Sequence, residues 1–143
     1  MRIRFVMLGK TRRAESRALF EDYIRRIGHY AEVEVSELRD SSAAALRKLK
    51  IEPGAAVVLL DAAGKQFSSQ QFARWLGQLR DSGTREIAFL CGDAEGFPPE
   101  LRTGAKHKVS LSTLTMPHEF ARVVLAEQIY RAFAILAGHP YPK

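Results

Sequence analysis

Two short, uninterrupted apolar runs constrain the fold of this chain more than any other feature. Ala55–Leu60 ends at Asp61, and Ile87–Cys91 ends at Gly92. A strand without alternating polar residues has both of its faces covered, as happens in parallel sheets with a layer of helices on each side. The two runs therefore predict strands inside a parallel sheet.

Segments with helical spacing separate these runs from three further predicted strands. We expect strands over Ile3–Leu8, Glu32–Leu38, Ala55–Leu60, Ile87–Cys91 and Lys108–Leu111, and helices over 13–27, from a cap at Ser41-Ser42 to about Lys50, over Ser68–Leu79, in a short turn from Pro98, and over 118–136. Strands that alternate with helices predict an α/β fold with a largely parallel sheet and helices on both faces. No linker divides the chain, so we expect residues 1–143 to form a single domain.

Bulk properties narrow the class of protein. The formal net charge of +6 and the pI near 9.8 are compatible with a polyanionic partner, of which nucleic acid is the commonest. No run approaches the roughly 20 apolar residues that cross a bilayer, and the first residues alternate like a strand rather than a signal peptide, so we expect a cytoplasmic protein without a membrane anchor. The single cysteine, Cys91, excludes an intrachain disulfide and a cysteine-based metal cluster.

Ligands of parallel sheets bind outside the carboxyl ends of the strands, and three such ends carry informative residues. Asp61 closes the first apolar run, where a simple strand-to-loop turn is as good an interpretation as a site. Gly92 and Gly96 follow the second run, either because the turn needs glycine or because the backbone there approaches a ligand. This spacing is neither a dinucleotide fingerprint nor a phosphate loop.

The third strand end is the hydroxyl-rich run Ser110–His118, which ends where the last helix begins. Leu114 and Met116 could pack under an aromatic base, while backbone groups of residues 111–116 bond to its edge. His118 and Arg122 lie four apart near the helix N-terminus, where a cation opposes the helix dipole, so a functional role for Arg122 is favoured.

The last helix has apolar residues around much of its circumference, including Phe120, Val124 and Phe133. Such a helix needs a second cover besides its own sheet, and a homodimer interface is the simplest one. Other classes of site are not indicated: we expect no metal centre and no serine nucleophile, and an inert thiol at Cys91 inside its apolar strand.

These residues together resemble the SPOUT-class 23S ribosomal RNA pseudouridine-N3 methyltransferases, and the resemblance covers nearly the whole chain. It rests on the following motifs: Gly9-Lys10, Glu21-x-Tyr23-x-x-Arg26, Leu60-Asp61 with Gly64-Lys65, Gly92 with Glu95-Gly96, the run Ser110–His118, Arg122–Ala132 (R-V-V-L-A-E-Q-I-Y-R-A), and Pro140-Tyr141. No single motif would suffice, but their order and spacing are specific.

The resemblance implies a C-terminal trefoil knot, an exception to the rule against threaded chains. It implies S-adenosylmethionine as the cofactor, held by Leu60, Gly92, Leu111, Ser112, Thr113, Leu114, Thr115 and Met116. The implied substrate is a pseudouridine in a 23S rRNA hairpin (helix 69), presented on the assembled 70S ribosome. It also implies a homodimer in which the cofactor of one protomer faces RNA-binding residues of the other.

In such an enzyme His118 is the best-placed acceptor of the N3 proton, and Arg122 or Lys143 would stabilise the developing anion. Two departures from the family pattern put residue roles in question. Asp93 stands where a second glycine is common, and Pro142 stands where a histidine usually follows the terminal tyrosine. Tyr141, Lys143 or His118 would have to replace that histidine.

Other functions stay open on sequence grounds. A SPOUT methyltransferase that acts on transfer RNA usually carries an extra RNA-binding domain, for which this chain has no room. A non-enzymatic RNA-binding module on the same fold would not bind S-adenosylmethionine tightly. A generic nucleotide-binding protein is disfavoured because the chain has no phosphate loop.

Overall fold

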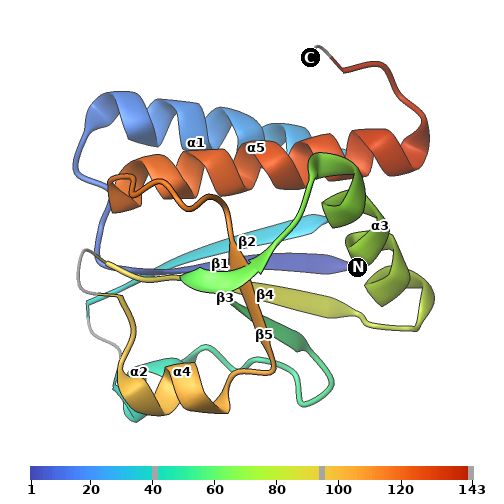
Figure 1. Cartoon of the computed structure of the whole chain (residues 1–143). Helices are drawn as coiled ribbons and strands as arrows, with labels where there is room; N and C mark the ends of the chain where they lie inside the picture. The colour runs from blue at the N-terminus through green and yellow to red at the C-terminus, as the bar shows by residue number, and fades with distance from the viewer. Residues whose placement is uncertain (40–41, 94–95, 142–143) are drawn as a thin grey trace.

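The computed structural model of the chain describes residues 1–39, 42–93 and 96–141. Five parallel strands form one sheet in the order β2-β1-β4-β3-β5 (Figure 1). Their bounds are β1 (Arg2–Leu8), β2 (Glu32–Leu38), β3 (Ala56–Gln66), β4 (Glu86–Cys91) and β5 (His107–Ser110). The central strand β4 is buried along its whole length, as its uninterrupted apolar sequence predicted.

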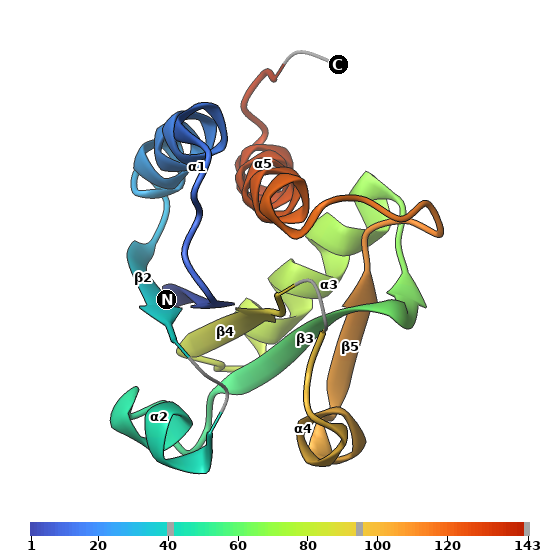
Figure 2. The same ribbon diagram turned by 90° about the vertical axis from the view of Figure 1, so that its left-hand side faces the viewer.

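Helices cover both faces of the sheet, which confirms the predicted α/β fold. Figure 2 shows α1 (Ala14–Ile27), α3 (Ser69–Asp81) and α5 (His118–Ala137) on one face, and the short α2 (Ala43–Lys48) and α4 (Pro99–Gly104) on the other. None of the helices in the described ranges has the length and apolar character that a membrane span requires.

Alternate residues of the strands supply the two cores. Phe5, Phe89 and Cys91 point into the larger core, under α1, α3 and α5. Val6 and Leu90 point into the smaller core, against residues of α2 and α4. Because successive side chains of a strand point to opposite faces, each apolar run fills both layers at once.

The last helix is covered mainly by its own chain. Leu125, Ile129 and Phe133 of α5 are buried in the larger core, and α5 packs against both α1 and α3. These two helices supply much of the second cover that the apolar pattern of the helix requires. Phe120 and Val124 stay exposed on α5, at 44% and 37% of their surface.

Strand β3 corrects one sequence prediction, because it does not end at Leu60 in a turn. It continues to Gln66, and both Leu60 and Lys65 lie opposite Val109 of β5, so the residues between them bulge out of the ladder. A Cβ atom on Gly64 would lie 2.6 Å from the carbonyl carbon of Lys108. The glycine therefore lets the two backbones touch, and the strand resumes its pairing beyond the bulge.

Candidate active site

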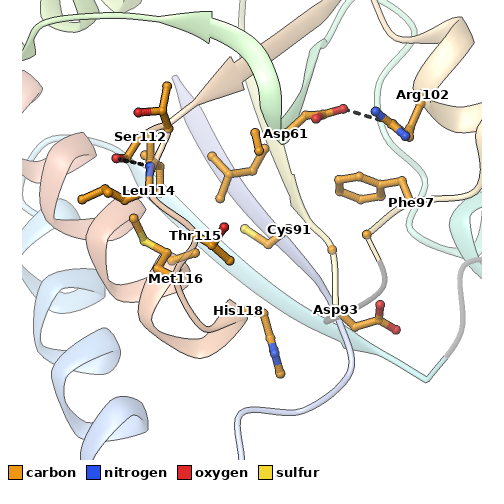
Figure 3. A pocket seen from close by; sticks show the side chains of 17 residues that line it. Asp61, Cys91, Asp93, Phe97, Arg102, Ser112, Leu114, Thr115, Met116 and His118 are labelled. Carbon is orange, nitrogen blue, oxygen red and sulfur yellow. Dashed lines mark hydrogen bonds and ion pairs between the residues drawn. The ribbon is translucent and has the colours of Figure 1, made fainter.

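The main candidate site is a cavity of about 400 Å³ at the bulge within β3 and the carboxyl ends of β4 and β5 (Figure 3). Three segments line most of it: Leu60–Ala62 from the β3 bulge, the turn after β4, and Leu111–Met116 after β5. The structure thus brings together the three strand ends that the sequence singled out. Its volume lies within the range of small-molecule sites.

Residues 111–116 form a loop that lines the cavity, and in the described part of the chain some of its main-chain N–H groups make no hydrogen bond. The hydroxyl of Ser112 accepts a hydrogen bond from the N–H of Leu114 (2.9 Å), and the hydroxyl of Ser110 donates to the carbonyl oxygen of Ser112 (3.1 Å). Within the described ranges the N–H groups of Thr113 and Thr115 donate no hydrogen bond. The small hydroxyl residues therefore shape the loop and leave main-chain donors for a ligand.

Leu114 makes an apolar wall for the same cavity. In the free chain 77% of its surface is exposed, although it belongs to the cavity lining. When an apolar ligand surface covers an exposed leucine at the mouth of a cavity, the burial of both surfaces stabilises the complex. Met116 also lines the cavity. The packing of these two side chains under an aromatic base stays a prediction.

The turn after β4 needs its two glycines for its own geometry. A Cβ atom on Gly92 would lie 3.0 Å from the backbone of Gly96, and Gly96 has a positive φ of 80°. The N–H of Gly96 donates to the carbonyl oxygen of Asp93 (3.0 Å). Gly92, Asp93 and Gly96 all line the cavity, so the turn requirement and the site coincide; Glu95 lies outside the described residues.

Asp61 in the cavity wall pairs with Arg102, a cation that the sequence analysis did not single out. Its carboxylate accepts a hydrogen bond from Arg102 Nε of α4 (3.1 Å) and another from the N–H of Ala63 (2.9 Å). The backbone hydrogen bond from Ala63, followed by Arg102, lowers the pKa of Asp61 against the opposing effect of burial. Phe97 is a second lining residue that the sequence did not single out, and the only available signal was its place just after the glycine turn.

Cys91 lines the cavity floor but is chemically quiet. The thiol is buried, and burial raises its pKa to about 12, with the charge of Arg122 acting in the opposite direction. The side chain stays a neutral thiol at physiological pH, in line with the inert thiol that the sequence predicted.

His118 and Arg122 start on one helix face but reach different places. His118 lines the cavity, whereas Arg122 does not and is 1% exposed. The guanidinium of Arg122 donates to the carbonyl oxygen of Leu8 (2.7 Å) and to the hydroxyl of Thr11 (2.9 Å). Burial lowers the pKa of Arg122, and the nearby Cys91 and acidic groups raise it. In the free chain Arg122 thus holds the connection between β1 and α1.

Glu119, the next residue after His118, holds the same connection from its other side. Its two carboxylate oxygens accept hydrogen bonds from the N–H groups of Arg12 (2.9 Å) and Arg13 (3.1 Å). The bond from Arg12 is the main reason that the pKa of Glu119 is lowered. Sequence reasoning missed Glu119, because nothing local indicates that its partners lie more than a hundred residues away.

Tyr141 lies away from the cavity in the same chain. Its hydroxyl donates to Glu127 Oε2 (2.9 Å), and its ring lies 4.9 Å from that of Tyr130 and 4.4 Å from the guanidinium carbon of Arg131. Glu127 also pairs with Arg131 at 2.8 Å, so this partly buried pair anchors the C-terminal segment. Burial is the first cause that raises the pKa of Tyr141. Pro142 and Lys143 lie outside the described residues.

Comparison with known proteins places this geometry in context. Residues 1–142 match the model of a family described as "Predicted SPOUT methyltransferase". Ribosomal RNA large subunit methyltransferase H of Koribacter versatilis is 40% identical over 144 residues, covering 99% of this chain and 97% of that protein. The protein of the same name from Gloeobacter violaceus is 42% identical over 151 residues, covering 99% and 98%.

Solved structures support the fold at much lower identity. The tRNA (m1G37) methyltransferase of Aquifex aeolicus superposes with a TM-score of 0.59 at 14% identity, over all of this chain and 75% of that one. A probable methylase family protein of Haemophilus influenzae superposes with the same TM-score at 12% identity, over 99% and 72%. At these identities the likeness extends to the fold alone.

Proposed function

This chain belongs to the SPOUT methyltransferase family, and we propose that it methylates N3 of a pseudouridine in 23S ribosomal RNA with S-adenosylmethionine as the methyl donor. The observation that carries the proposal is the cavity built from three strand ends, in a chain that is about 40% identical over almost its full length to ribosomal RNA methyltransferases. The basic charge of +6 fits an RNA substrate.

The residues of the cavity fit the proposed cofactor. Backbone N–H groups of residues 113 and 115 are available to the edge of an adenine, and Leu114 and Met116 supply apolar surface for its faces. Leu111 and Ser112 extend the same wall, and Leu60 and Gly92 complete it from β3 and from the turn after β4. When bound, S-adenosylmethionine supplies a methyl group on a positively charged sulfur. Asp93 adds a carboxylate to the lining, which favours a cationic ligand.

His118 is the proposed acceptor of the proton on N3. Among the described residues that line the cavity it is the only histidine, and its half-buried position at the start of α5 leaves the ring accessible to a substrate. N3 must lose its proton before or during methyl transfer, and an imidazole takes up protons in the physiological range. The remaining contribution of the protein is to hold donor and acceptor in line.

The proposed roles of Arg122 and Tyr141 differ from that of His118. Arg122 uses both terminal nitrogens on Leu8 and Thr11, so the geometry supports a positioning role at the start of α5 rather than direct contact with the developing anion. Tyr141 is anchored at Glu127, about 13 Å further along α5 than His118. We propose that Tyr141 serves the cavity of a second protomer.

A homodimer is therefore part of the proposal. Its support within the chain is the exposed pair Phe120 and Val124, which lie one helical turn apart on α5 between the cavity end and the Tyr141 anchor. Sedimentation of the purified protein tests the dimer, and a Val124→Arg variant is expected to be monomeric. A monomeric wild-type protein would contradict it.

The C-terminal trefoil knot belongs to the same proposal. Its support is the match of residues 1–142 to the SPOUT methyltransferase family model.

Mass spectrometry of ribosomal RNA from cells that lack this protein tests the proposed reaction. Loss of one methyl group from a pseudouridine in the helix 69 hairpin is expected, and complementation should restore it. Comparison of purified 70S ribosomes with free RNA as substrates then tests whether the assembled particle is the substrate. An unchanged modification profile would contradict the proposal, and failure to bind S-adenosylmethionine in calorimetry would favour a non-enzymatic RNA-binding module.

A further inference from the structure

Side chains of other elements bond to the main chain of the connection between β1 and α1, residues 9–13. Thr11 N–H donates to Glu37 of β2 (2.8 Å), and its carbonyl oxygen accepts a hydrogen bond from Arg17 (2.6 Å). The hydroxyl of Thr11 accepts from Arg122, and the next two N–H groups donate to Glu119. Four side chains from three elements therefore hold a connection only a few residues long.

The basic side chains of this connection are left outside. Lys10, Arg12 and Arg13 are all exposed, whereas Thr11 between them is 7% exposed. Within the described ranges none of the three forms an ion pair with a carboxylate. The nearest carboxylates bond elsewhere: Glu119 accepts from two main-chain N–H groups, and Glu37 accepts from a third and pairs with Arg17 at 3.4 Å.

One of these cations is also held in position. The guanidinium carbon of Arg13 lies 5.6 Å from the ring centre of Phe120 on α5, which restricts the side chain while its N–H groups remain available. The three cations Lys10, Arg12 and Arg13 outnumber the two nearby acidic residues, Glu15 on the first turn of α1 and Glu119 on α5.

The connection stands beside the cavity, at the same edge of the sheet. His118 lines the cavity and Glu119, the next residue of α5, bonds to Arg12 and Arg13. Figure 1 shows the β1–α1 connection next to the start of α5. A strand of RNA with one base at His118 would carry its neighbouring phosphates within the reach of these side chains.

We infer that Lys10, Arg12 and Arg13 form a phosphate-binding surface for the backbone of the RNA that flanks the target base. This inference rests on the proposed function. It adds that the β1–α1 connection contacts the RNA backbone, while the cavity receives the target base. The hydrogen bonds to the N–H groups of residues 11–13 fix the main chain that carries these cations. Phosphate contacts of this kind position the RNA and carry no sequence information.

A triple variant, Lys10→Gln with Arg12→Gln and Arg13→Gln, tests the surface against a matched control. The control is Arg74→Gln with Arg85→Gln and Lys106→Gln, three exposed cations that make no ion pair in the described parts of the chain and do not line the cavity. Both variants lose the same charge. Binding to unmethylated 70S ribosomes is measured by filter retention across a series of salt concentrations, together with kcat, KM and the affinity for S-adenosylmethionine.

The triple variant at Lys10, Arg12 and Arg13 is expected to weaken ribosome binding on the order of tenfold. The slope of log affinity against log salt concentration should fall by about 2, with kcat and cofactor affinity close to wild type. The control variant should lose less than a third of that effect. Equal binding by the two triple variants, or wild-type binding by the variant at Lys10, Arg12 and Arg13, would overturn the inference. Filter retention needs no methyl transfer, so it decides the surface even if the wild-type protein proves inactive, an outcome that would count only against the proposed reaction.

Discussion

Arg122 of the last helix donates a hydrogen bond to the carbonyl oxygen of Leu8 at the end of the first strand, at 2.7 Å. This bond joins residues that are 114 positions apart in the chain. The same guanidinium reaches Thr11, so one buried side chain ties the start of α5 to the β1–α1 connection. The arrangement of the cavity residue His118 and of the basic side chains beside it therefore depends in part on Arg122.

Replacement of Arg122 is expected to loosen this support. Arg122→Met keeps much of the volume but leaves two buried oxygens without donors, so the free energy of unfolding should fall by about 1–3 kcal/mol. Urea unfolding measures the loss, and faster hydrogen exchange of the Thr11, Arg12 and Arg13 amides should accompany it. Arg74→Met, at an exposed position, should change stability by no more than roughly 0.5 kcal/mol. Unaltered exchange in the Arg122 variant would contradict the positioning role.

Because Glu119 holds the β1–α1 connection through its carboxylate, the stability of the protein should depend on pH. Because the hydrogen bond from the N–H of Arg12 lowers its pKa below the ordinary 4.5, the stabilisation by its carboxylate is complete above pH 4.5. It is lost as the pH falls through the folded-state pKa. Wild type should therefore exceed Glu119→Gln in stability at pH 7, and the difference should narrow near pH 3. Urea titrations at the two pH values check this, with Glu15→Gln as the exposed control; a constant difference would be inconsistent with it.

His118 should affect chemistry more than binding. His118→Ala is expected to lower the single-turnover rate of methyl transfer on the order of a hundredfold, as for the loss of a general base. Its affinity for S-adenosylmethionine should stay within about threefold, since the proposed cofactor contacts come mainly from the loop at residues 111–116. His29→Ala, at an exposed position, serves as the control. Near-normal single-turnover methylation by His118→Ala would remove it from the mechanism.

Asp93 should discriminate between the charged donor and its neutral product. Asp93→Asn is expected to weaken S-adenosylmethionine by about five- to tenfold, an electrostatic effect of roughly 1 kcal/mol. S-adenosylhomocysteine lacks the sulfonium charge, so its affinity should change less. Calorimetry with both ligands measures the difference, with Asp81→Asn as the control outside the cavity. Equal losses for the two ligands would show that Asp93 acts through the shape of the turn.

Gly64 should tolerate no side chain. Gly64→Ala places a methyl group 2.6 Å from the carbonyl carbon of Lys108, where only backbone movement can relieve the clash. The expected cost is about 2 kcal/mol or more, or failure to fold. Gly104→Ala, with no atom within 4 Å of the added carbon, should behave like wild type in the same urea titration. A Gly64→Ala protein of wild-type stability would argue against the close contact.

Local pattern was sufficient for the architecture. The apolar runs Ala55–Leu60 and Ile87–Cys91 predicted two buried strands, and their carboxyl ends, together with residues 111–116, do line one cavity. Strand ends of a parallel sheet converge whatever their distance in sequence, so a prediction of the fold also located the site.

Contacts between distant residues were not accessible in the same way. The extension of β3 depends on the contact of Gly64 with β5, and no feature of residues 61–66 alone indicates a resumed strand. Arg4, Glu86 and Arg122 are charged residues that the fold buries, because each finds a partner elsewhere in the chain or at another strand. Arg102 joins the cavity through Asp61, again across elements. Polarity read along the sequence predicts exposure for Arg4, Glu86 and Arg122, all of which are buried.

The packing of α5 between α1 and α3 also bears on when the protein acquires its structure during synthesis. The first strand can pair early with β2, but the larger core lacks Leu125, Ile129 and Phe133 until α5 has been made. The β1–α1 connection likewise waits for Glu119 and Arg122. Contacts of such long sequence separation form late. The pocket and the connection beside it therefore reach their final arrangement only when α5 has packed onto the helices and strands that precede it.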